Sequence, residues 1–183
     1  MPELSAAPNP SFWSLVPDRD HADEWVLALL GARPQTQQEH LLLAAELSLQ
    51  AREASDGGLV LLHADPVAEL YAALTLVATE AEPIVQAGRA LALAAALTPG
   101  AWEPSVVEFH LHGAPAWRVS TLVADNGPAD DGEVHLLTSV TTAYIMTIAG
   151  RLVVAKLSPL SPAGAIIAQA RAEQVLCTLE LHD

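Results

Sequence analysis

Four apolar runs of strand length follow one another closely in the second half of the chain. They are "SVVEFHLHG", "AWRVSTLVAD", "EVHLLTSVTTAYIMTIA" and "RLVVAKLS", all within residues 105–158. The connections between them, HGAPA, NGPADDG and AGR, are short, and each contains glycine. Short glycine-containing connections are typical of antiparallel hairpins, because parallel neighbours need a long crossover. The pattern therefore predicts an antiparallel sheet in this half of the chain.

A long helix is predicted in the first half, in "TQQEHLLLAAELSLQAREASDGG". Leu42, Ala45 and Leu49 recur at helical spacing and are expected to form its buried face. Thr36 and Glu39 fit a capping box, with Thr36 as the N-cap. The two glycines that follow predict the end of this helix.

Other helices and strands are predicted on either side of the sheet region. "DRDHADEWVLALLGARP" and "PIVQAGRALALAAALTPG" indicate helices, the second beginning at Pro83, and Ser161 with Pro162 indicates the start of a last helix. "LVLLHADP" and "ELYAALTLVAT" are runs of strand length. Strands grouped together, with helices before and after them, indicate the α+β class, an antiparallel β-sheet covered by helices.

One domain accounts for the length of 183 residues, since neither an internal repeat nor a long linker interrupts the sequence. Residues 1–17 are rich in proline, serine and asparagine and are predicted to form an irregular N-terminal arm. Phe12 and Trp13 are expected to pin this arm to the rest. Residues 18–183 are predicted to form a single α+β domain.

The chain is acidic along its whole length. It has 22 acidic and eight basic residues, a formal charge of −14, with 13 acidic and four basic residues in 1–91. A phosphate backbone would be repelled by this charge, and no cluster of lysine and arginine offsets it. We therefore expect no nucleic-acid partner, while an acidic mimic of nucleic acid stays open as a minor alternative.

The N-terminal sequence and the single cysteine bear on the compartment. "MPELSAAPNPSFW" lacks a basic end followed by an apolar core, so it does not read as a secretory signal. The longest apolar run, "ALALAAAL" at 90–97, is shorter than the ~20 residues that a membrane-spanning helix needs. Cys177 has no partner for a disulfide and is expected to be a buried thiol. These features favour a cytoplasmic protein without a membrane span.

Two histidines and a glutamate stand close together in "VEFHLHG". If this run is a strand, Glu108, His110 and His112 share one face, and His135 from a nearby strand completes a candidate metal site. Alternation of apolar and polar residues is, however, what any half-buried strand requires, and no familiar metal-ligand motif is present. We expect the outer face of a strand, with metal binding at these four residues as the alternative.

Other catalytic signals are weak. The sequence has no G-x-S-x-G, no phosphate-binding glycine motif and no calcium-loop spacing among Asp125, Asp130, Asp131 and Glu133. His63 and Asp65 are spaced as a dyad would be, although a turn at the end of a strand explains both residues. The expectation is a protein without enzymatic activity and without a cofactor.

The C-terminal part, about residues 104–183, resembles PsbP-like domains. The resemblance rests on Tyr144, Gly150, Leu157, Ser158 and Pro162, which fit that family's closing strand pair and proline-started helix, and on a preceding strand-Gly-strand hairpin with Gly113 and Arg118. It implies an antiparallel sheet between helical layers, and the roles of assembly factor, extrinsic subunit or chaperone found in that family. It transfers no site residue, because the shared positions serve the fold.

These observations favour a non-enzymatic protein-binding module, a chaperone or adaptor for a secreted or assembled partner. A small-ligand binder is a further alternative. Hydrophobic residues make up 51% of the chain, and this predicts a homodimer that covers apolar surface, unless alanine merely inflates the count. The expected interfaces are the strand edges in 104–158 and the small-residue face of the helix at 84–97, formed by Ala87, Gly88, Ala92, Ala94 and Ala95.

Overall fold

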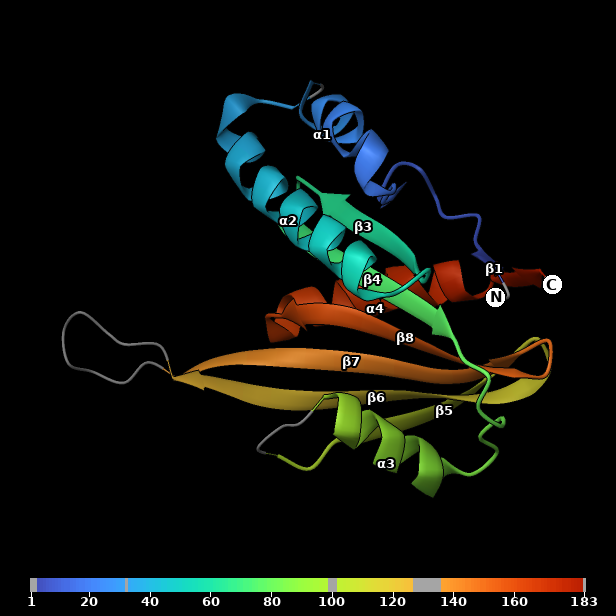
Figure 1. Cartoon of the computed structure of the whole chain (residues 1–183). Coiled ribbons are helices and arrows are strands. Elements are labelled where there is room, and N and C mark those ends of the chain that lie inside the picture. The colour runs from blue at the N-terminus through green and yellow to red at the C-terminus, as the bar shows by residue number, and fades with distance from the viewer. Residues whose placement is uncertain (1–2, 32, 99–101, 127–135, 183) are drawn as a thin grey trace.

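A computed structural model describes residues 3–31, 33–98, 102–126 and 136–182 (Figure 1). Its strands are β1 (Glu3–Ser5), β2 (Trp13–Leu15), β3 (Leu59–Asp65), β4 (Leu70–Ala78), β5 (Ser105–Leu111), β6 (Ala114–Asn126), β7 (Leu136–Ile148), β8 (Arg151–Leu160) and β9 (Glu180–His182). Its helices are η1 (Arg19–His21), α1 (Ala22–Gly31), α2 (Gln35–Ala54), α3 (Ala87–Leu97) and α4 (Pro162–Leu176).

Seven of the described strands form one antiparallel sheet in the order β2-β3-β4-β8-β7-β6-β5, and β1 pairs with β9 in a small second sheet. Helices cover the large sheet, so the predicted α+β class is confirmed (Figure 1). The hairpins expected from the glycine-containing connections are present at β5–β6 and β7–β8. Both have two-residue turns with positive φ at each residue, His112 and Gly113 in one and Ala149 and Gly150 in the other, which is the geometry of type I′ turns.

The two faces of the large sheet are covered differently. Helix α4 packs across β4, β7 and β8 on one face, where Ala168, Ala172 and Leu176 join the main core with Tyr144 and Leu157. On the other face α2 packs on β3 and β4, and α3 packs on β6 and β7. Alternation along each strand divides the side chains between these faces.

The beginnings of the helices only partly agree with the sequence prediction. Helix α4 has the predicted cap, since Ser161 Oγ accepts a hydrogen bond from Gly164 N at 3.2 Å. The capping box at Thr36 and Glu39 is wrong, because α2 begins earlier, after Pro34, without a side-chain cap. Proline cannot donate a backbone hydrogen bond and often stands at a helix start, so the helix extends back to it. Helix α3 begins at Ala87 rather than at Pro83.

The buried face of α2 agrees with the prediction at Ala45 but not at Leu42 or Leu49. Leu41, Ala45 and Ser48 are buried against the sheet. Leu42, Leu43 and Leu47 are exposed, and Leu49 is only partly buried. Three consecutive leucines left the helical phase ambiguous, and packing on β3 and β4 selects the phase that buries Leu41.

The N-terminal arm is more regular than the sequence indicated. It contains β1, which pairs with the C-terminal β9, and β2, which pairs with β3. Three-residue strands are too short to show a period, so the prediction of an irregular arm is wrong for these segments. Trp13 is 4% exposed and lies in the main core, so it pins the arm as expected.

Cys177 was expected to be buried, and it is exposed. It lies just after α4, where Leu176 and Leu179 take the buried positions. The thiol therefore faces solvent at the end of the helix.

Replacement of Ala94 tests how α3 is seated. Ala94 has no exposed surface and packs with Val119 and Ala143 of the sheet, so its expected place on an interface face of this helix is wrong. Ala94→Glu should lower the free energy of unfolding by about 3 kcal/mol or more, because it buries an unpaired charge. Urea denaturation measures this. Ala95→Glu, at an exposed position of the same helix, is the control and should cost far less; equal losses for the two variants would contradict this seating of α3.

Candidate functional site

An apolar groove lies between α2 and α3 on the sheet face opposite α4. It has a volume of about 580 Å³ and is open to solvent. The end of α2 forms one wall, α3 forms the other, and β4 and β8 form the floor. The lining residues are Ala51, Ala54, Ser55, Thr75, Val77, Thr79, Ala81, Leu93, Leu97, Leu152, Val154 and Lys156.

The spacing of the helices explains why this groove exists. Helix α2 is centred on β3 and β4, helix α3 on β6 and β7, and β8 lies between them in the strand order. Three strand spacings separate the two helix positions, or about 14 Å. Packed helices lie only about 8–10 Å apart. The helices therefore do not close over β8, and Val154 and Lys156 stay accessible on this face.

The lining is almost entirely apolar. Exposure increases along β8 from buried Leu152 through partly buried Val154 to exposed Lys156. Lys156 is the only lysine of the chain, and its Nζ lies 3.3 Å from the carbonyl oxygen of Leu97 at the end of α3. The described lining includes neither a carboxylate nor a histidine or cysteine. The groove therefore offers mainly an apolar contact surface, with Lys156 at its edge.

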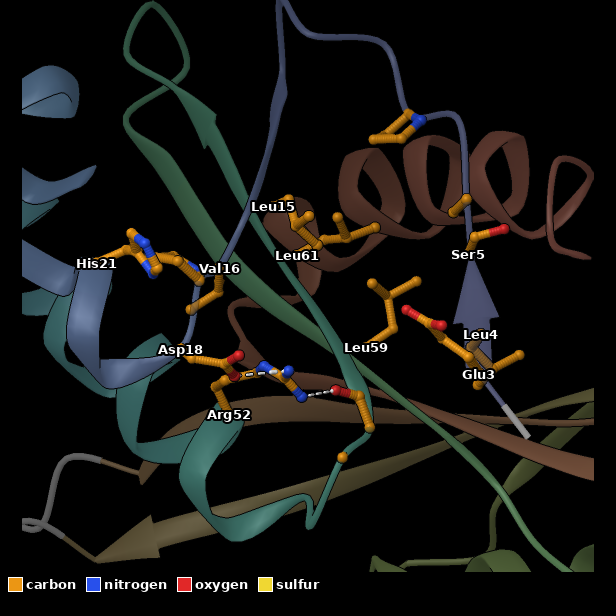
Figure 2. Close-up of a pocket in the computed structure, with 15 residues that line it drawn as sticks. Glu3, Leu4, Ser5, Leu15, Val16, Asp18, His21, Arg52, Leu59 and Leu61 are labelled. Atoms are coloured by element: carbon orange, nitrogen blue, oxygen red, sulfur yellow. Dashed lines mark hydrogen bonds and ion pairs between the residues drawn. The ribbon is translucent and has the colours of Figure 1, made fainter. Parts of the chain in front are cut away.

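A second hollow, of about 390 Å³, lies under the N-terminal arm (Figure 2). The Arg52 guanidinium in it is held by two partners. Arg52 Nη2 contacts Asp18 Oδ1 at 2.7 Å, and Arg52 Nη1 donates to the carbonyl oxygen of Gly58 (Figure 2). These contacts tie the end of α2 to Asp18, just after the arm, and to Gly58, just before β3. Because these contacts occupy the Arg52 guanidinium, we interpret its role in this hollow as structural.

The candidate metal ligands do not share one strand face. Glu108 and His110 lie on β5 and are exposed, but β5 ends at Leu111. His112 lies in the hairpin turn with φ +51, so the alternation of the strand does not extend to it. His135 lies outside the described residues, as do Asp130, Asp131 and Glu133. No group of three or more His, Cys, Asp or Glu is arranged to hold a metal ion within the described part of the chain, and metal binding stays a prediction.

His63 and Asp65 do not form a dyad. Asp65 Oδ1 accepts hydrogen bonds from the backbone N–H groups of Val67 and Ala68, both at 3.1 Å, so it stabilises the turn after β3. His63 is fully buried between Phe12 and Trp13, and neither ring nitrogen has a hydrogen-bond partner among the described atoms. Burial lowers the pKa of His63 below its usual value. The turn interpretation of Asp65 is confirmed, whereas the sequence did not indicate a buried histidine.

Sequence reasoning also missed the groove, because its residues come from four separate segments. Alternation on β4 and β8 divides their side chains between the two faces of the sheet. Nothing local indicated that α2 and α3 would stand apart above them.

Comparisons with known proteins add little to this geometry. No family model matches the chain, and no curated protein matches it. One solved structure that the chain matches is LpqN, described as involved in cell envelope biogenesis of Mycobacterium tuberculosis. It is 13% identical, the match covers 100% of this chain and 85% of that chain, and the TM-score is 0.48. The PsbP-like resemblance of residues 104–183 stays a prediction.

The helices give one further finding. Within the described ranges, none is long and apolar enough to cross a membrane.

The buried His63 predicts a pH dependence of stability. In the unfolded chain the pKa of His63 is about 6.5, and in the folded protein it is lower. Below pH 6.5 the unfolded chain therefore takes up a proton on His63 more readily than the folded protein does. The free energy of unfolding should therefore fall as the pH drops below 6.5, by at most about 1.4 kcal/mol per pH unit from this residue. His63→Phe should remove this component in urea titrations between pH 7 and pH 5.

Removal of an exposed histidine serves as the control. His40→Ala on α2 should keep the pH dependence of the unmodified protein. The same pH profile in all three proteins would show that His63 is not the group responsible.

Proposed function

We propose that this chain is a non-enzymatic binding module that receives an apolar segment of a partner protein in the groove between α2 and α3. A chaperone or adaptor for a secreted or assembled partner is the role that fits such a site. The observation that carries the proposal is the open apolar floor of the groove, formed by Val77, Leu152 and Val154 in the middle of the sheet.

The openness of the groove favours a protein segment over a small molecule. Small-ligand sites typically enclose 70–90% of the ligand surface. This groove is open to solvent along its outer side. An apolar surface with polar groups at its rim, here Lys156 and Ser55, is typical of an interaction site.

The dimensions restrict what can lie in the groove. The axes of α2 and α3 lie about 14 Å apart, roughly 5 Å more than the axes of two packed helices. This extra width is less than the ~10 Å diameter of a third helix. A row of apolar side chains or an extended segment fits this width. An acidic group beside that segment would meet Lys156, and the net charge of −14 favours a partner that is basic elsewhere.

The lining of the groove is apolar apart from one lysine and a few hydroxyl groups, a composition suited to holding an apolar segment. Metal binding at Glu108, His110, His112 and His135 remains the alternative from the sequence. No contact in the described structure favours it.

Site-directed photo-crosslinking tests the groove in the cells that make the protein. Leu97 lines the groove and is 39% exposed, so a benzoylphenylalanine residue in its place should form a covalent adduct with a partner protein. Ala54→Trp in the same chain should reduce that adduct at least about tenfold, because the indole ring fills the groove and displaces contacts worth more than 1.4 kcal/mol. Denaturing gels and mass spectrometry measure the adduct.

Leu43 provides the matched control. It is 56% exposed on α2 but does not line the groove, so benzoylphenylalanine there should not give the same adduct. Equal capture from both positions would contradict the groove as the binding site. Capture of lipid alone at position 97 would contradict a protein partner.

A further inference from the structure

The strand β5 leaves one edge of the large sheet unpaired. It is the last strand of the described sheet, next to β6 (Figure 1). Val106 and Val107 on this strand are 38% and 40% exposed, and Glu108 and His110 are exposed as well. Neither Glu108 nor His110 makes an ion pair or a side-chain hydrogen bond with another described residue. An open edge with exposed apolar residues is a template for pairing with another strand.

The hairpin defines which backbone groups of β5 face outward. Leu111 and Ala114 flank the two-residue turn, so they form a hydrogen-bonded pair. Hydrogen-bonded and non-bonded pairs alternate, and the N–H and C=O groups of Val106, Glu108 and His110 therefore point away from β6. Pro115, which has no N–H, stands opposite His110 at a non-bonded position, as this alternation requires.

Charge selects one register for pairing β5 with a second copy of itself. Antiparallel pairing about Glu108 would place two carboxylates directly opposite each other, which is unfavourable. Pairing about Val107 would set His110 opposite Pro104, which cannot donate to the ladder. Pairing centred on Phe109 sets Glu108 of each copy opposite His110 of the other. It also makes those positions hydrogen-bonded pairs, as their outward backbone groups require.

We propose that two copies of this chain join edge to edge by antiparallel pairing of β5, centred on Phe109, with Glu108 of each copy beside His110 of the other. About four backbone hydrogen bonds form at this seam, and each Glu108 carboxylate lies where it can accept a hydrogen bond from the His110 imidazole of the other copy. The two Phe109 side chains meet at the centre on the face that carries Tyr144, whose ring lies 6.4 Å from Phe109 at 86°. The second copy also covers part of Val106 and Val107.

A disulfide at the two-fold axis tests the register. The variant Phe109→Cys/Cys177→Ser should form a covalent dimer under mild oxidation, since non-bonded opposite residues have Cα atoms about 4.5 Å apart. In the variant Val107→Cys/Cys177→Ser the two thiols would lie four residues out of register, about 13 Å apart, and should not couple. Removal of Cys177 is needed because that thiol is exposed.

Charge exchange tests the pairing in solution, by sedimentation of the chain at 10–500 μM and pH 7. His110→Glu should raise the dimer dissociation constant at least about tenfold, because two attractive pairs become repulsive. His110→Lys should lower it, and Glu108→Lys/His110→Glu should restore dimerisation. A control for folding is the circular dichroism spectrum, which should not change, since both side chains are exposed.

Two outcomes would overturn the proposal. One is a monomer at all concentrations for both the unmodified protein and His110→Lys. The other is a dimer whose dissociation constant neither His110→Glu nor His110→Lys changes, and in which Val107→Cys forms the disulfide as readily as Phe109→Cys. If this edge instead pairs with a strand of a partner protein, the chain should stay monomeric, which is the first outcome.

Discussion

Close packing of α4 on the centre of the sheet holds the structure together. Alanines at 165, 168 and 172 are buried, and their small side chains allow the helix to approach β4, β7 and β8. Polar contacts fix its position along the strands. Arg118 Nη1 lies 2.5 Å from Glu173 Oε1, and Gln169 Nε2 donates to Ser120 and Thr142 at 3.1 and 2.9 Å. Burial raises the pKa of Tyr144, which lies under this helix and stays neutral.

Because one face is closed in this way, the other face can be left partly open. The strand β8 shows the difference most directly. Val153, Ala155 and Leu157 are fully or almost fully buried towards α4, while Leu152, Val154 and Lys156 face the groove and become progressively more exposed. The core under α4 supplies the stability of the central strands, so α2 and α3 need not meet above them. A binding surface in the middle of a sheet therefore does not require the fold to give up its main core.

The sequence was informative where structure is determined locally. Glycine at 113 and 150 marked the two tight hairpins, and Ser161 with Pro162 marked the start of α4. It was less informative where distant segments meet. The pairing of β1 with β9 joins the two ends of the chain, and three-residue strands have no period to recognise.

The candidate sites also divide into features that the local sequence predicts and features that depend on distant segments. The alternation in β5 correctly placed Glu108 and His110 on one face, but the type I′ turn removes His112 from it. The groove depends on the distance between α2 and α3. That distance follows from which strands each helix covers, and no single run of residues encodes it.

The two proposed surfaces are compatible in space. Antiparallel pairing of edge strands has its two-fold axis perpendicular to the sheet, so in the proposed dimer both grooves open on the same face. Seven strand spacings then separate β8 of one copy from β8 of the other, about 34 Å before twist is considered. A partner with two apolar segments at that separation would bind both grooves at once, and the second contact would form at high effective concentration. Each groove then needs only a low affinity for its segment. A low affinity agrees with a site that is open and has a single charged group at its rim.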